Sequence, residues 1–67
     1  MATFQIEFVR HMEGHADPAV VARLNADTAL RYLHDVISHA QHMQRPAEAN
    51  GLQIRERDGP TLYKMLF

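Results

Sequence analysis

Histidine is the residue type in this sequence best suited to chemistry. Five of the 67 residues are histidines, a high number for this length. His39 and His42 stand three positions apart in a segment expected to be helical, about 60° apart around the helix axis, so both could reach one ion. Metal sites commonly take three or four nitrogen, sulfur or carboxylate ligands. The spacing therefore makes His39 and His42 candidate metal ligands, with His11 or His15 needed to complete the site.

The alternative is that these histidines are solvated. His39 and His42 fall near the expected C-terminus of the helix, where the helix dipole favours a protonated imidazole. His11 and His15 lie in the connection after an N-terminal strand, and that connection need not be close to this end of the helix. The spacing within one chain therefore does not imply a site of four histidines.

An acid–base pair is the second arrangement that could do chemistry. Asp35 stands four positions before His39, so the two are helix-surface neighbours and Asp35 could orient His39 as a general base. Ser38 points about 100° away from His39 on a helix, and no other nucleophile is placed to use such a base. A surface ion pair worth about 0.2–0.5 kcal/mol explains the same spacing. A small enzyme with a site around His34, Asp35 or His39, assembled at a subunit interface, is therefore one functional hypothesis.

The composition does not support other kinds of site. Seven basic and eight acidic residues give a formal charge of −1 with neutral histidines, whereas nucleic-acid-binding domains usually carry a strongly basic stripe. No apolar run approaches the roughly 20 residues that cross a bilayer, the first residues lack a secretion signal, and isolated glycines form no phosphate-binding loop. We therefore expect no cofactor, no nucleic acid and no membrane partner. A cytoplasmic location is expected, and the absence of cysteine fits it.

The N-terminal half is expected to contain one strand and two helices. Residues 3–10 place aromatic and β-branched side chains at every second position, which predicts a half-buried strand. Asp17 can cap free amides and Pro18 suits the first helical position, so a short helix is expected over residues 18–24. A longer helix is expected from residue 28 to about residue 43.

A break between the two helices rests on the position of three aliphatic side chains. If the longer helix is extended backward, Val20, Val21 and Leu24 lie on its polar side rather than on its apolar stripe. A turn near residues 25–27 avoids this exposure, because asparagine and aspartate favour local turns. The alternative is one long helix whose N-terminal apolar patch contacts a partner.

The C-terminal residues predict a hairpin. Residues 52–57 and 61–67 read as strands joined through Asp58-Gly59, a strong hairpin signal. A loop of two residues and a loop of four residues give the same pairing between the two strands. Directly opposed residues of an antiparallel pair point to the same face of the sheet. The expected pairs are Ile54 with Tyr63 and Leu52 with Met65.

This pairing assigns the two faces of the hairpin and leads to a fold. The core face would hold Leu52, Ile54, Tyr63, Met65 and Phe67. The other face would hold Gln53, Arg55, Arg57 and Lys64, with Leu62 and Leu66 among them. The last strand is then apolar on both faces, which favours a central position. We therefore predict a single α+β domain over residues 1–67 of order β-α-α-β-β, with a three-stranded antiparallel sheet (first, third, second) and a helix layer on one face.

Surplus apolar residues predict an oligomer. A domain near this length removes only about 60% of its unfolded surface from water, and chains below roughly 70–80 residues often need a disulfide, a metal or a partner. Large exposed apolar patches often mark interfaces, and a symmetric dimer is the commonest way to cover them. The residues predicted to form this interface are Val9, Val20, Val21, Leu24, Leu62 and Leu66.

Three functions are consistent with these observations. The leading hypothesis is a non-catalytic protein-interaction or regulatory protein, a homodimer that binds or regulates another protein. The second is a metal-binding protein that uses His39 and His42. The third is the small enzyme with an interface active site described above.

Overall fold

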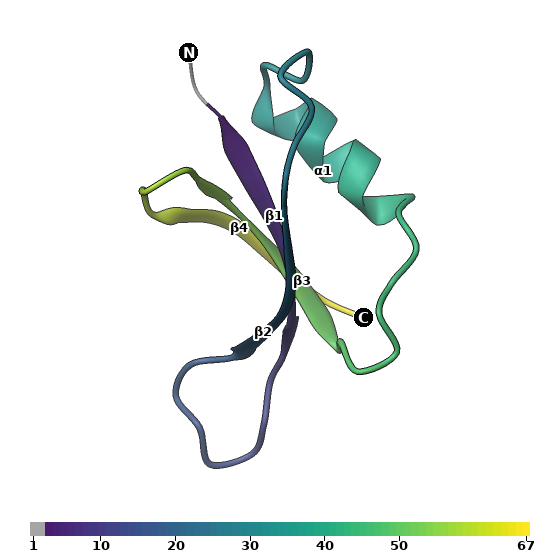
Figure 1. Cartoon of the computed structure of the whole chain (residues 1–67). Coiled ribbons are helices and arrows are strands. Elements are labelled where there is room, and N and C mark those ends of the chain that lie inside the picture. The colour runs from purple at the N-terminus through teal and green to yellow at the C-terminus, as the bar shows by residue number, and fades with distance from the viewer. Residues whose placement is uncertain (1–2) are drawn as a thin grey trace.

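The chain forms a four-stranded antiparallel sheet with one helix. The computed structural model describes residues 3–67. The sheet has the order β2-β1-β3-β4, and α1 packs on one of its faces (Figure 1). The order along the chain is β-β-α-β-β, which confirms the α+β class. The elements are β1 (Phe4–Arg10), β2 (Ala19–Asn25), α1 (Leu33–Gln41), β3 (Gly51–Glu56) and β4 (Thr61–Leu66).

The predicted short helix over residues 18–24 is wrong, because this segment is the strand β2. Ala22 and Leu24 pair with Phe8 and Ile6 of β1 and pack against the core. A β-bulge skips Val21 in this pairing, and a bulge puts one extra residue into a strand and breaks its alternation. The sequence therefore shows two adjacent valines where a regular strand would show a period of two.

The predicted order of three strands is also wrong, because β3 rather than β4 lies beside β1. β1 and β3 are the two inner strands of the sheet, and β2 and β4 are its edges. Leu52 and Ile54 of β3 are buried, whereas Leu62 and Leu66 of β4 are exposed. The apolar residues on both faces of β4 therefore reflect uncovered side chains and not a central position.

The hairpin register predicted from the sequence is confirmed. Leu52 pairs with Met65 and Ile54 with Tyr63. The turn places Asp58 at φ 59°, and the Gly59 N–H donates to the Glu56 carbonyl at 2.9 Å. A second bulge follows, because Arg55 pairs with Thr61 and leaves Leu62 as the extra residue.

The helix is shorter than the predicted segment from residue 28 to about residue 43. Asp27 does not cap it: its carboxylate accepts a hydrogen bond from the Ala29 N–H at 2.9 Å, and its carbonyl accepts one from the Leu30 N–H. These bonds form a turn, so the helix begins only after Tyr32. Among residues 3–67, no helix has the length and apolar character that a membrane crossing needs.

The core lies between α1 and the sheet. Val36 and Ala40 of α1 are buried, and they meet alternating side chains of β1 and β3. Phe67, which follows β4, places its ring centroid 6.3 Å from that of Phe8, and the Arg45 guanidinium lies 4.0 Å from the Phe67 ring centroid. The remaining members of the buried cluster are Phe4, Ile6, Ala26, Leu52 and Ile54.

Candidate interaction surface

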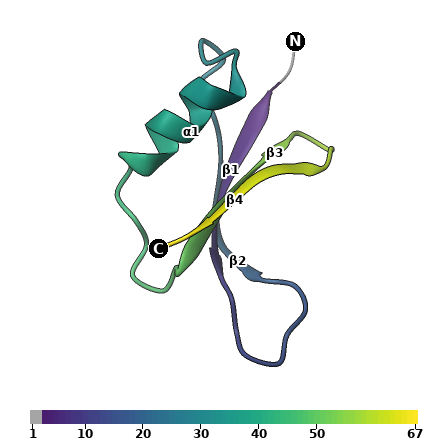
Figure 2. The same cartoon turned by 180° about the vertical axis from the view of Figure 1, so that it is seen from behind.

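The sheet has a second face, which points away from α1. Figures 1 and 2 show α1 on one side of the sheet, and we call the other side the open face. Successive side chains of a strand point to opposite faces. Phe4, Ile6 and Phe8 belong to the core cluster, so Gln5, Glu7 and Val9 of β1 project from the open face.

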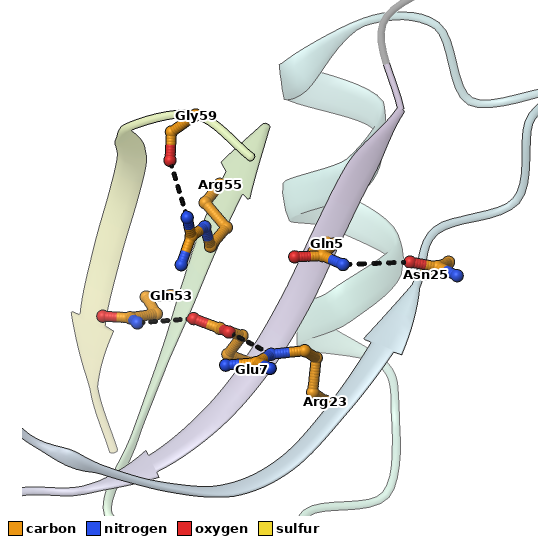
Figure 3. A network of polar contacts seen from close by, with 7 residues as sticks. All are labelled: Gln5, Glu7, Arg23, Asn25, Gln53, Arg55 and Gly59. Atoms are coloured by element: carbon orange, nitrogen blue, oxygen red, sulfur yellow. Dashed lines mark hydrogen bonds and ion pairs between the residues drawn. The ribbon is translucent and has the colours of Figure 1, made fainter. Parts of the chain in front are cut away.

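A polar row crosses the open face through Glu7. The backbone register places Arg23 of β2, Glu7 of β1, Gln53 of β3 and Lys64 of β4 side by side. The Gln53 amide donates a hydrogen bond to one Glu7 oxygen at 2.7 Å, and Arg23 Nε donates to the other and forms an ion pair with it (Figure 3). Both oxygens of Glu7 are therefore bonded within the sheet.

Glu7 is a fully buried acidic side chain, with 0% of its surface exposed. Burial by itself raises the pKa of a carboxyl group. In Glu7 the hydrogen bonds from Gln53 and Arg23, together with the positive charges of Arg23 and Arg55, outweigh this effect and lower the pKa below its ordinary value. Glu7 is therefore ionised at neutral pH. Its hydrogen bonds with Arg23 and Gln53 join β1 to β2 and to β3.

The next row is also polar and leaves the open face basic. The Gln5 amide donates to the Asn25 side-chain oxygen at 3.3 Å, and Arg55 Nη2 donates to the Gly59 carbonyl at 2.9 Å (Figure 3). Within residues 3–67, Arg55 Nε is buried without a hydrogen-bond partner. Arg23, Arg55 and Lys64 bring three cations to this face, against the single carboxylate of Glu7.

An apolar row crosses the open face on the other side of the polar row. Val20 of β2, Val9 of β1, Gly51 of β3 and Leu66 of β4 stand opposite one another in the register. Val9 is 1% exposed, whereas Val20 is 43% and Leu66 68% exposed. The row therefore has a buried centre and two exposed ends, one on each edge strand.

The absence of a side chain at Gly51 allows neighbouring groups to approach its backbone closely at the centre of the apolar row. A Cβ at this position would lie 2.9 Å from the Met65 carbonyl oxygen and 3.4 Å from side-chain carbons of His11 and Leu66. Asn50 fixes the same region, because its side chain accepts from the His11 N–H at 2.7 Å and donates to the His11 carbonyl at 3.0 Å. A hollow here is lined by His11, Lys64, Met65 and Leu66.

We expect Gly51→Ala to destabilise the fold by about 1–3 kcal/mol, because the added methyl group meets a backbone oxygen that cannot move alone. Urea unfolding followed by far-UV circular dichroism measures this change. Gly14→Ala is the matched control: it has no atom within 4 Å of the new Cβ, but φ is +83°, so only backbone strain is added there. A stable Gly51→Ala variant would show that β3 and β4 can separate without cost.

The structure gives the six predicted interface residues different surroundings. Leu24 packs against the core on the side of α1, and Val21 is half-buried at the bulge. Val9 lies at the buried centre of the apolar row. The residues with large exposed side chains are Val20, Leu62 at 39% and Leu66.

The candidate metal ligands lie at the C-terminal end of α1. His39 is in the last turn and His42 caps the helix, with His42 Nδ1 2.7 Å from the Ser38 carbonyl oxygen. His11 lies beside Gly51 and Leu66 instead. Across residues 3–67, no group of three or more His, Cys, Asp or Glu side chains is arranged to hold a metal ion.

The proposed acid–base residues lie on the exposed surface of α1. Asp35 pairs with its neighbour His34 at 3.6 Å, and these side chains are 52% and 93% exposed. His39 is exposed as well. Among residues 3–67, Asp35 therefore forms an ion-pair contact with His34 and none with His39, so the expected pairing of Asp35 with His39 is not formed.

Sequence reasoning missed Glu7 as the centre of the polar row. The alternation of β1 assigns Glu7 to a polar face, and a polar face is ordinarily solvated. Its burial depends on β2 and β3 lying on both sides of β1, and β2 was expected to be a helix. A glutamate in the middle of a strand with cations in both neighbouring strands is the signal that could have found it.

Comparisons of the chain with known proteins identify no relative. No family model matches the chain, and neither a curated protein nor a solved structure shows significant similarity to it.

Proposed function

We propose that this protein is a non-catalytic interaction domain that works as a homodimer and assembles through the apolar row and β4. The observation that carries the proposal is the exposure of Leu66, which is 68% exposed at the end of a row whose centre is buried. Leu62, on the same strand, is 39% exposed. Apolar side chains that gather on one edge of a small sheet are typical of a surface that a partner covers.

The size of the chain supports a second copy as the partner. A domain of 67 residues has a small core, and association is one of the few ways to add buried apolar area without a disulfide or a metal. A twofold symmetric contact presents the same residues from both copies. A heterologous protein that binds this surface is the other outcome that the test below can detect.

We expect Leu66→Lys to dissociate the homodimer. The variant removes an apolar side chain worth about 1.5–3 kcal/mol on full burial and adds a cation to a face that already carries Arg23, Arg55 and Lys64. Because both copies of the dimer carry the change, the dissociation constant should rise at least roughly 100-fold. Size-exclusion chromatography with light scattering, over a range of protein concentrations, measures the mass of wild type and variant.

Tyr32→Lys is the matched control, because Tyr32 is 71% exposed and precedes α1, away from β4. It should leave the dimer intact. A wild-type protein that stays monomeric at every concentration would contradict the proposal, and a heterologous partner would then have to cover Leu66. If the dimer tolerates Leu66→Lys and dissociates with Tyr32→Lys, the interface lies on the side of α1 and the proposed interface is wrong.

A further inference from the structure

The backbone of β4 has unpaired hydrogen-bonding groups along its outer edge. In an antiparallel sheet, successive residues of a strand direct their N–H and C=O groups to alternate sides. The Phe67 N–H donates to the Asn50 carbonyl at 3.0 Å, and Met65 and Tyr63 face β3 in the same register. Lys64 and Leu66 therefore direct their backbone groups away from β3, to an edge where no strand of residues 3–67 lies.

The stretch from Tyr63 to Phe67 is the regular part of this edge. The bulge of β4 lies before it, at Leu62. The other edge strand, β2, has its bulge in the middle, at Val21, and bulges at sheet edges hinder pairing with another chain. β4 is therefore the edge better shaped to accept a further strand.

We infer that β4 pairs antiparallel with β4 of a second copy, with Met65 on the twofold axis. This inference rests on the proposed function, and it names the surface that forms the homodimer. In this register Lys64 and Leu66′ (the prime marks the second copy) exchange both backbone hydrogen bonds, and so do Leu66 and Lys64′. Met65 then faces Met65′ as a non-hydrogen-bonded pair.

The side chains favour this register over its neighbour. With Met65 central, the stem of Lys64 lies against the exposed Leu66′ on the open face. On the face of α1, half-buried Tyr63 stands opposite Phe67′, whose ring is 40% exposed. Cross-strand aromatic pairs stabilise a sheet.

The neighbouring register, with Lys64 central, places Lys64 directly opposite Lys64′. Like charges directly opposed across two strands destabilise a sheet. That register also leaves Phe67 without an aromatic partner. The register with Lys64 central differs from the proposed one by a slide of two residues along β4′. A slide of only one residue would set Lys64 opposite Met65′, and the backbone groups of Met65′ already face its own β3. The centred register on Met65 is therefore the one that satisfies both the backbone and the side chains.

The resulting dimer has one continuous sheet of eight strands, four from each copy. Lys64 and Leu66 of both copies then lie at its centre, and the two open faces join into one surface. At the joint the apolar row of each copy meets the polar row of the other, because Leu66 stands opposite Lys64′. Val20 and Arg23 of each copy lie at the outer edges of the joined surface, on β2. It is twice as wide as the surface of one copy.

Disulfide crosslinking tests the register directly, because the natural chain has no cysteine. Residues opposed in a non-hydrogen-bonded antiparallel pair have Cα atoms about 4.5 Å apart, which lies within the range for a disulfide. Met65→Cys should therefore form a covalent dimer under mild oxidation. Lys64→Cys should not, since its counterpart in the second copy is displaced by two residues. Non-reducing electrophoresis and intact mass measure the crosslinked fraction.

Tyr32→Cys gives the rate of random collision, because Tyr32 is more exposed than Met65. Met65→Cys should crosslink at least tenfold faster than this control. Crosslinking of Lys64→Cys in place of Met65→Cys would overturn the register. A wild-type dimer in which neither variant crosslinks faster than the control would overturn the edge pairing and leave the proposed function standing. A wild-type monomer would overturn both.

A charge test on Leu66 needs no cysteine and covers the case in which Met65→Cys fails to fold. Edge pairing sets residue 66 opposite Lys64′, so Leu66→Glu should keep the dimer while Leu66→Lys loses it. A contact between two open faces that buries Leu66 would be weakened by both changes. Equal loss of mass in both variants, measured by light scattering, would therefore overturn the edge pairing.

Discussion

Glu7→Gln should lower the free energy of unfolding by about 2–3 kcal/mol at pH 7. Losing one member of a buried pair leaves the groups around it unpaired, which costs about 3–5 kcal/mol where both are buried. Arg23 is 53% exposed in its side chain, so water can solvate its charge and the cost should be smaller. Urea unfolding of both proteins at pH 7 measures the difference, provided that the free energy of unfolding falls with urea concentration at the same slope in both.

Gln5→Ala is the matched control for this change. Gln5 lies on the same strand and the same face, two residues before Glu7, and it makes one hydrogen bond, to Asn25 at 3.3 Å. Its loss should cost about 0.5 kcal/mol, since that bond is long and half-exposed. If Glu7→Gln were as mild as Gln5→Ala, the Glu7 carboxylate would contribute no more than an ordinary polar side chain of the open face.

The contribution of Glu7 should disappear at acid pH. The hydrogen bonds and charges around Glu7 lower its pKa in the folded protein, so its stabilising effect is complete above the ordinary pKa of about 4.3. The effect is lost as the pH falls through the lower, folded pKa. The gap between wild type and Glu7→Gln should therefore narrow below about pH 4. Glu56 is an exposed carboxylate on β3, and Glu56→Gln is the matched control for this comparison.

The strand β1 and the C-terminal hairpin could be predicted because their side chains alternate without interruption. Phe4, Ile6 and Phe8 reach the core as expected. The pairs Leu52–Met65 and Ile54–Tyr63 follow from the loop length, even though the bulge at Leu62 could not be foreseen. Local pattern and turn chemistry agree in these segments, which is the condition under which sequence reasoning works.

β2 could not be predicted because its pattern is shared by a short helix and a bulged strand. Val20 and Val21 are adjacent, and only the pairing of Val20 with Val9 shows that the chain skips Val21. Asp17 and Pro18 would suit a helix start as well as a loop. The choice is made by the free edge of β1, which gains a whole row of backbone hydrogen bonds from β2. No window of sequence contains that long-range gain.

The candidate surface was only partly visible in the sequence for the same reason. Leu62 and Leu66 were assigned to the outer face by parity, and the pairing of Leu66 with Gly51 confirms this for Leu66. Leu62 is the extra residue of the bulge, so Thr61 takes the place opposite Arg55 that parity gave to Leu62. Val9 and Val20 join Leu66 in one row only once β2 pairs with β1. Alternation tells which face a residue occupies and does not tell how deeply it is covered, so the burial of Glu7 and Val9 needed the fold.

Phe8→Ala should cost about 3–5 kcal/mol, which is the range for removing a buried aromatic side chain. Phe8 is 2% exposed, lies in the core cluster and holds the Phe67 ring at the end of β4. Native domains have roughly 0.05–0.15 kcal/mol of stability per residue, so a chain of 67 residues has about 3–10 kcal/mol in total. The variant should therefore be largely unfolded at low protein concentration, as circular dichroism would show.

Association should partly offset this loss, because a homodimer that forms only from folded chains makes stability depend on concentration. Each tenfold rise in protein concentration should add about 1.4 kcal/mol to the apparent stability of the variant. Phe8→Leu, which keeps most of the volume, should cost less than about 1.5 kcal/mol and remain folded when dilute. If the melting temperature of Phe8→Ala does not change with protein concentration, the folding of the chain is not coupled to its association. Leu66 would then be covered only after the monomer had folded alone.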